Sequence, residues 1–155
     1  MNETASRVIK IPAKPESVRQ AELQRQLRAA AYCRVSTKEE DQANSYEVQK
    51  EYYTDKIMSN PAWTMAGVFA DKGITGTSVK KREDFMRMIR HCRQRKIDVV
   101  LTKSVSRFAR NTVDCLYYTR ALKELGIAVI FEKENINSLE EDSELRITLS
   151  GAFAQ

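Results

Sequence analysis

The sequence is poor in long apolar runs, cysteines and histidines, and the first of these shortages argues against a membrane protein. Its longest apolar runs, such as Ile127–Phe131, fall far short of the roughly 20 residues that a membrane-spanning helix needs. The opening stretch MNETASRVIK contains no apolar signal core. We therefore expect a cytoplasmic protein without a membrane partner.

The cysteines show no pattern of pairing or metal binding. They are three in number and widely separated, and none belongs to a C-x-x-C pair. This argues against a disulfide framework and a zinc site, and favours core or surface thiols. The acids that could hold Mg²⁺ form no spaced ligand set: Asp71, Glu83 and Asp84. We expect neither a metal nor a small-molecule cofactor.

The single histidine limits how a serine could be activated. A serine nucleophile usually passes its proton to a histidine held by a carboxylate. His91 lies inside the basic segment RMIRHCRQR, where a surface or capping role is the better interpretation. No serine stands in a G-x-S-x-G turn, and no cysteine is followed by an arginine six residues later. Acyl transfer and cysteine-based phosphate chemistry therefore have little support.

The length of 155 residues suits one compact domain with tails. We interpret residues 1–26 as a tail, because they contain Pro12, Pro15 and many polar residues. Within this tail, Ser17–Gln20 fits a capping box that could start a short helix. Residues 27–140 form the predicted domain.

At the other end, apolar residues recur at helical spacing in the segment ELRITLSGAFAQ: Leu145, Leu149 and Phe153. The sequence stops within this pattern, without a cap or a closing loop. We therefore expect residues 141–155 to be the start of a truncated C-terminal helix that serves oligomerisation.

Apolar runs alternate with amphipathic stretches along the predicted domain. Four strands are expected near Ala29–Arg34, Thr64–Asp71, Asp98–Leu101 and Ile127–Glu132. Three helices are expected at Ser45–Met58, Glu83–Arg95 and Val113–Leu125, the last capped by Asn111 or Thr112 and ended by Gly126. This alternation predicts an α/β fold with a mostly parallel central sheet and helices on both faces.

Charge is distributed unevenly along the chain. Residues 80–110 carry eleven basic side chains against three acids, whereas residues 132–144 carry six acids against one lysine. A basic segment of this kind is typical of a surface that binds nucleic acid. A solvated helix face is the better interpretation for three of these arginines: Arg87, Arg90 and Arg93.

Arginines stand where predicted strands end. Arg34 precedes Ser36 at the first strand end, and Arg107 and Arg110 follow the third strand. Guanidinium groups match the charged oxygens of a phosphodiester with paired hydrogen bonds, and they lower the pKa of a nearby hydroxyl. In parallel sheets, ligands collect at the carboxyl ends of the strands, where Ser36, Asp71 and Lys103 also fall. This spacing by itself is a weak signal.

Five motifs together resemble the serine recombinases of the resolvase/invertase superfamily. They are YCRVST, NSYEVQ, FADKGITGTSVKKREDF, LTKSVSRFARN and ITLSGAFAQ, in the order and spacing of the catalytic domain. The likeness covers roughly residues 30–155. The long gap between Ser36 and Gln49 and the segment KSVSRFARN look more like the large serine recombinases and the transposases.

The resemblance implies that Ser36 attacks a DNA phosphodiester and becomes joined to the 5′ phosphate, without a metal or ATP. Arg34, Arg107 and Arg110 would hold the scissile phosphate. Partners would be double-stranded DNA and further copies of the chain, as a dimer or tetramer. The implied activity is site-specific recombination, in integration and excision or in transposition.

Other residues are expected to support this site. Arg82 and Gln49 would support the pocket, and Asp71 matches a family acid that assists proton movement. Small family members carry a further acid where this chain has Ser106, which leaves Asp71 as the only acid candidate. DNA contacts are expected from a set of basic and hydroxyl residues: Lys103, Thr75, Arg82, Arg107 and Arg110.

Two other interpretations remain open from the residues. A receiver-like regulatory module would use Asp71 as a phosphate acceptor, but would leave Arg34, Arg107 and Arg110 without a role. A DNA-binding or assembly module would need the basic face and no reactive serine. Phe108 fits a packing role better than stacking on a base.

Overall fold

The computed structural model describes residues 15–17, 25–36, 40–73 and 82–153. The expected capping box at Ser17–Gln20 lies mostly outside these ranges. The strands are β1 (Leu27–Ser36), β2 (Trp63–Gly73), β3 (Val99–Thr102), β4 (Ala128–Phe131) and β5 (Ile136–Asn137). The helices are α2 (Tyr46–Met58), α3 (Glu83–Arg93), α4 (Val105–Phe108), α5 (Thr112–Glu124) and α6 (Ser143–Phe153), with a 3-10 turn, η1, at Gln42–Asn44.

The strands form one sheet in the order β2-β1-β3-β4-β5. Strand β1 pairs in parallel with β2 and β3, and β3 pairs in parallel with β4. Among the described strands, only the two-residue β5 runs antiparallel, against β4. The mostly parallel sheet expected from the sequence is confirmed, whereas β5 was not predicted.

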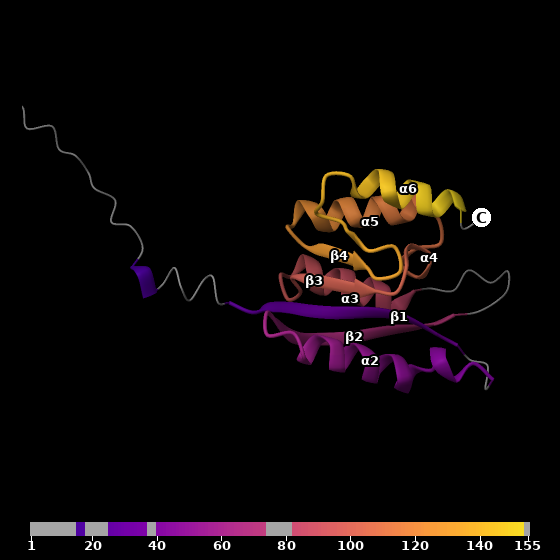
Figure 1. Ribbon diagram of the computed structural model, residues 1–155, viewed down its shortest axis with the longest axis horizontal. Helices are drawn as coiled ribbons and strands as arrows, with labels where there is room; N and C mark the ends of the chain where they lie inside the picture. The colour runs from indigo at the N-terminus through magenta and orange to yellow at the C-terminus, as the bar shows by residue number, and fades with distance from the viewer. Residues whose placement is uncertain (1–14, 18–24, 37–39, 74–81, 154–155) are drawn as a thin grey trace, which may run out of the picture.

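Alternating side chains of β1 build two apolar cores, one on each face of the sheet. Ala29, Ala31 and Cys33 pack with α2 on one face. Ala30 and Tyr32 belong to the core on the other face, together with buried residues of α3, α4, α5 and α6. In Figure 1, α2 lies below the sheet, and α5 and α6 lie above it. Helices therefore cover both faces, as expected.

Polar caps and left-handed residues explain where the helices begin and end. Ser45 and Asn111 cap α2 and α5, because the side chain of each accepts the backbone N–H of the third residue of its helix. Gly126, with φ of 75°, follows the end of α5. Helix α3 ends at Arg93, two residues earlier than expected, and Arg95 has a positive φ of 61°.

Helix α6 confirms the helical spacing predicted near the end of the chain. Its side chains Leu145 and Leu149 are 63% and 51% exposed, and its Arg120–Glu144 ion pair with α5 has an N–O distance of 2.6 Å. In the part of the chain that the structure describes, no helix is long and apolar enough to span a membrane.

Candidate active site

The carboxyl ends of the parallel strands meet at one edge of the sheet, on the right of Figure 1. Ser36 is the last residue of β1 and pairs with Gly73, the last residue of β2. Two positions earlier in the same register, Arg34 pairs with Asp71. Arg34 and Ser36 are both half-buried. The strand pairing therefore brings the predicted nucleophile, an arginine and the predicted acid to one edge.

Gln49 holds the end of β1 from helix α2. Its side-chain amide donates to the backbone carbonyl of Arg34 at 2.9 Å and to that of Asn44 at 3.0 Å. A single carboxamide thus links η1, α2 and the strand end that carries Ser36. Gln49, which we expected to support the pocket, makes both of these hydrogen bonds.

Asp71 is engaged by three donors. Its carboxylate accepts the backbone N–H groups of Asp84 and Phe85 at 2.9 and 3.0 Å, and the Tyr32 hydroxyl at 2.8 Å. The two N–H groups belong to the first turn of α3, whose N-cap residue, Arg82, makes no side-chain capping bond. Asp71 therefore caps α3 from the neighbouring strand. The same contacts leave a receiver-like phosphate acceptor without support.

Arg82 connects three elements around this cap. Its guanidinium lies over the Phe85 ring, 3.7 Å from the centroid, and its Nε donates to the Tyr32 hydroxyl at 3.4 Å. A second guanidinium nitrogen donates to the backbone carbonyl of Phe108, at the end of α4. Arg82 thus ties β1 and the start of α3 to the helix that carries Arg107.

Tyr32 is the residue of this network that the sequence analysis missed. Its ring is buried and its hydroxyl lies between Asp71 and Arg82. Burial is the largest of the effects that raise the pKa of Tyr32, to about 12. The phenol therefore stays neutral and donates to Asp71. Its place in the motif YCRVST, two residues before Arg34, was the available signal.

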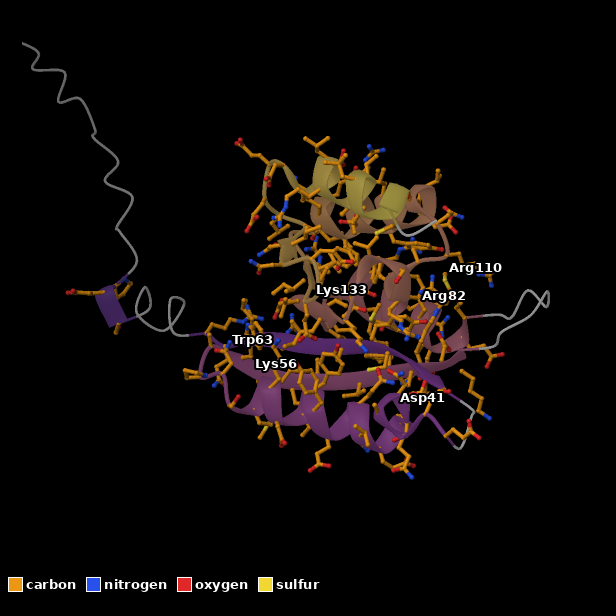
Figure 2. The ribbon with its side chains drawn as sticks, turned by 45° about the vertical axis from the view of Figure 1, so that its right-hand side comes forward. Asp41, Lys56, Trp63, Arg82, Arg110 and Lys133 are labelled. Carbon is orange, nitrogen blue, oxygen red and sulfur yellow. The ribbon has the colours of Figure 1, made fainter. Side chains whose placement is uncertain are left out.

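Helix α4 is a single turn that follows β3. Ser104 caps it, accepting the Arg107 N–H at 3.3 Å, and Phe108 is buried with its ring edge against Phe85 and Phe131. The packing role expected for Phe108 agrees with this burial. Arg107 is half-buried and Arg110 is exposed. Figure 2 shows Arg82 and Arg110 at the same edge of the molecule.

Two of the predicted phosphate-holding groups have no partner side chain among the residues that the structure describes. Within the described ranges, no hydrogen bond or ion pair involves the guanidinium of Arg34 or Arg107. Lys103 is exposed directly after β3. Thr75, the remaining residue of the predicted DNA contacts, lies outside the described residues.

A cavity of about 240 Å³ is lined by residues of α2, Gln49 among them, and by Lys103 at this edge. Glu132 lies in its wall and accepts the Tyr52 hydroxyl and the Lys56 ammonium, both at 2.7 Å. Burial opposes the charged form of Glu132, but the hydrogen bonds from Lys56 and the tyrosines outweigh it. The pKa of this carboxyl is therefore lowered.

The cysteine thiols and the histidine imidazole are not candidates for this chemistry. All three cysteines are buried, and burial raises the pKa of each thiol to about 12. They are core thiols, one of the two interpretations drawn from the sequence. His91 packs edge-on against Phe69 at a centroid distance of 5.5 Å.

Comparison with known proteins agrees with this architecture. The R46 site-specific recombinase of Escherichia coli is 27% identical over 129 residues, which is 83% of this chain and 61% of that protein. The chain therefore spans less than two thirds of the length of this relative.

Two solved structures have the same fold. A resolvase family site-specific recombinase from Streptococcus pneumoniae has a TM-score of 0.63 and 29% identity, and the match covers 83% of this chain and 86% of that one. The N-terminal catalytic domain of TP901-1 integrase has a TM-score of 0.61 and 21% identity, with coverage of 82% and 93%. Residues 29–155 match the family model of the resolvase N-terminal domain, so the chain belongs to the resolvase family.

Proposed function

We propose that this domain cleaves and rejoins DNA strands in site-specific recombination, with Ser36 as the nucleophile. The observation that supports this most strongly is the network around the strand ends. Gln49 fixes the strand that carries Ser36, and Arg82 fixes the helix that carries Arg107. A site that must hold a nucleophile and a cationic group in register needs such supports.

The proposed step exchanges one phosphodiester bond of the DNA for a bond between Ser36 and the 5′ phosphate. The Ser36 hydroxyl oxygen attacks the phosphorus, a bond from serine to the 5′ phosphate forms, and the bond to the 3′ oxygen breaks. The serine gives up its proton, and the leaving oxygen takes one to become a 3′ hydroxyl. The reverse step, with a new 3′ hydroxyl, rejoins the strands without an external energy source.

Arginines would provide the charge that this step requires. Arg34, Arg107 and Arg110 can donate to the non-bridging phosphate oxygens, where negative charge gathers in the transition state. Their positive charge would also favour the alkoxide of Ser36. Among the residues that the structure describes, no carboxylate forms an ion pair with Arg34 or Arg107 that would have to break first.

Asp71 has a different role in this proposal from the one that the resemblance implied. Since its carboxylate accepts three hydrogen bonds, we assign it to holding α3 and Tyr32. Proton movement at Ser36 then depends on the arginines and on solvent.

The partners in this proposal are double-stranded DNA and further copies of the chain. Lys103 and Arg110 are exposed at the active edge and would contact the DNA backbone, which positions a protein on the duplex without reading its sequence. The exposed Leu145 and Leu149 of α6 would meet a second subunit. The likeness of KSVSRFARN to large recombinases and transposases supports a role in a mobile element.

The test is a covalent protein–DNA adduct. The protein is incubated in EDTA with a pool of nicked duplexes of randomised sequence. After cleavage, the short strand next to the nick diffuses away, so the strands cannot be rejoined. We expect an adduct that survives denaturing gel electrophoresis. Ser36→Ala should abolish it, and Ser59→Ala, an exposed serine at the opposite end of α2, should not. A reaction that requires Mg²⁺ would favour a nuclease instead.

A further inference from the structure

The turn between β4 and β5 holds the beginning of α4. Both carboxylate oxygens of Glu134 lie 3.3 Å from the backbone nitrogen of Val105, the first residue of α4. This N–H has no partner inside the helix, as at every helix start. With Arg82 on the carbonyl of Phe108, the two ends of α4 are each held by a side chain from another element.

Helix α6 holds the same turn from its other side. The guanidinium of Arg146 donates to the backbone carbonyls of Glu134 and Asn135, at 3.0 and 3.1 Å. Asn135 has φ of 53°, a left-handed conformation that asparagine tolerates, and its N–H donates to the carbonyl of Glu132 at 3.2 Å. The turn is thus a closed unit with α6 on one side and α4 on the other.

Packing alone does not fix the outer side of α4. Val105 and Phe108 anchor its inner side in the core. They share this core with Ile147 of α6. On the outer side, a cavity of about 380 Å³ is lined by residues of both helices, Ser106 and Ser150 among them. The cavity leaves the outer side of α4 less closely packed than its inner side, and the hydrogen bonds through the turn add a polar link between the two helices to their contact in the core.

We propose that Glu134 and Arg146 are positioning residues that couple the place of α6 to the orientation of α4, and through it to Arg107. A shift of α6 pulls on the turn through Arg146 and loosens the Glu134 carboxylate from the Val105 N–H. The consequence for DNA cleavage rests on the proposed function, whereas the coupling itself does not.

Amide hydrogen exchange, resolved by NMR for Val105 and Arg107, tests the coupling without DNA. In Arg146→Ala, exchange at these amides should become about tenfold faster, the size expected when a hydrogen bond to a charged group is weakened. The matched control is Arg120→Ala, which removes the other arginine link of α6, to Glu144, but does not touch the turn. Exchange at α4 should be unchanged in the control. Equal exchange in the parent and Arg146→Ala, or equal acceleration in both variants, would overturn the proposal.

Variants of Glu134 test the same link from its other end. Glu134→Ala removes both acceptor oxygens, and Glu134→Gln keeps one of them. Exchange at Val105 should therefore be fastest in Glu134→Ala and intermediate in Glu134→Gln. Unchanged exchange in Glu134→Ala would show that the carboxylate does not hold α4.

The adduct assay then separates this proposal from the proposed function. Arg146→Ala should form the adduct several-fold more slowly at saturating DNA, with duplex affinity unchanged, because Arg107 is misplaced and not removed. If the parent protein forms no adduct at all, the proposed function fails, but the exchange measurements still decide the coupling.

Discussion

The side-chain amide of Gln49 donates to the backbone carbonyl of Arg34 at 2.9 Å, across fifteen positions of sequence. The contact fixes the end of strand β1, just before Ser36, from a helix that the core already anchors through Tyr53 and Ile57. An amide fits here because both of its acceptors are carbonyl oxygens, and a carboxylate would face them with like partial charge.

Gln49→Glu should therefore destabilise the strand end. Two hydrogen bonds are lost, and we expect the free energy of unfolding to fall by about 1–3 kcal/mol. Urea unfolding followed by circular dichroism measures the loss. The control is Glu51→Gln, an exposed position on the same helix, which should change little. Equal stability of the two variants would mean that the amide bonds contribute nothing.

Arg107→Lys should separate catalysis from folding. The charge remains, but the planar fork that spans two phosphate oxygens is lost, and removal of such a donor typically lowers the rate by about 10²–10³. The melting temperature should stay the same, since no side chain in the described ranges pairs with this guanidinium. Arg93→Lys, exposed at the far end of α3, is the control. Undiminished adduct formation in Arg107→Lys would remove this arginine from the site.

Asp71→Asn should behave as the loss of a helix cap. One oxygen remains to accept from α3, so the expected cost is about 1 kcal/mol of unfolding free energy. The folded fraction should still form the adduct, with the pH dependence of the parent. A loss of adduct formation by several orders of magnitude, without destabilisation, would restore Asp71 as a proton carrier.

Gly151→Ala should disturb the packing of α6 against α5. A Cβ at this position collides with the side chain of Thr112, the first residue of α5. We expect a destabilisation of about 1–3 kcal/mol, as in other overpacked sites. Thermal unfolding measures it, and Gly151→Ala combined with Thr112→Ala, which removes the Thr112 hydroxyl that the new Cβ meets, tests the contact: the double variant should recover part of the loss. No loss in the single variant would contradict the close approach of α5 and α6.

Glu132 should make stability depend on pH. Its pKa is lowered in the folded protein, so its contribution is complete above about pH 4.3, the ordinary value for glutamate, and is lost as the pH falls through the folded-state value. Glu132→Gln removes the titrating group. Its stability should decline less than that of the parent between about pH 5 and 3. Parallel stability curves would show that Glu132 does not contribute.

Sequence periodicity predicted the parallel strands, because burial on both faces produces apolar runs such as Ala29–Cys33. It also predicted the longer helices α2, α3, α5 and α6. It could not predict α4, whose single turn is held by Arg82 and Glu134 from distant elements. Strand β5, with two residues, is too short for any periodic signal.

The candidate site likewise contains residues that the sequence predicted and residues that it did not. The spacing of Arg34 and Ser36 and the five motifs directed attention to the strand ends. The partners of Asp71 could not be inferred, because the N–H groups it caps lie thirteen and fourteen positions away and meet it only in the folded protein. Tyr32 was overlooked for the same reason.

Mass spectrometry of the protein–DNA adduct, after digestion with protease and nuclease, tests the central claim most directly. The account predicts a nucleotide joined through its 5′ phosphate to the peptide that contains Ser36, with a free 3′ hydroxyl on the released strand. Attachment to another residue, attachment through a 3′ phosphate, or cleavage without any covalent intermediate would contradict it.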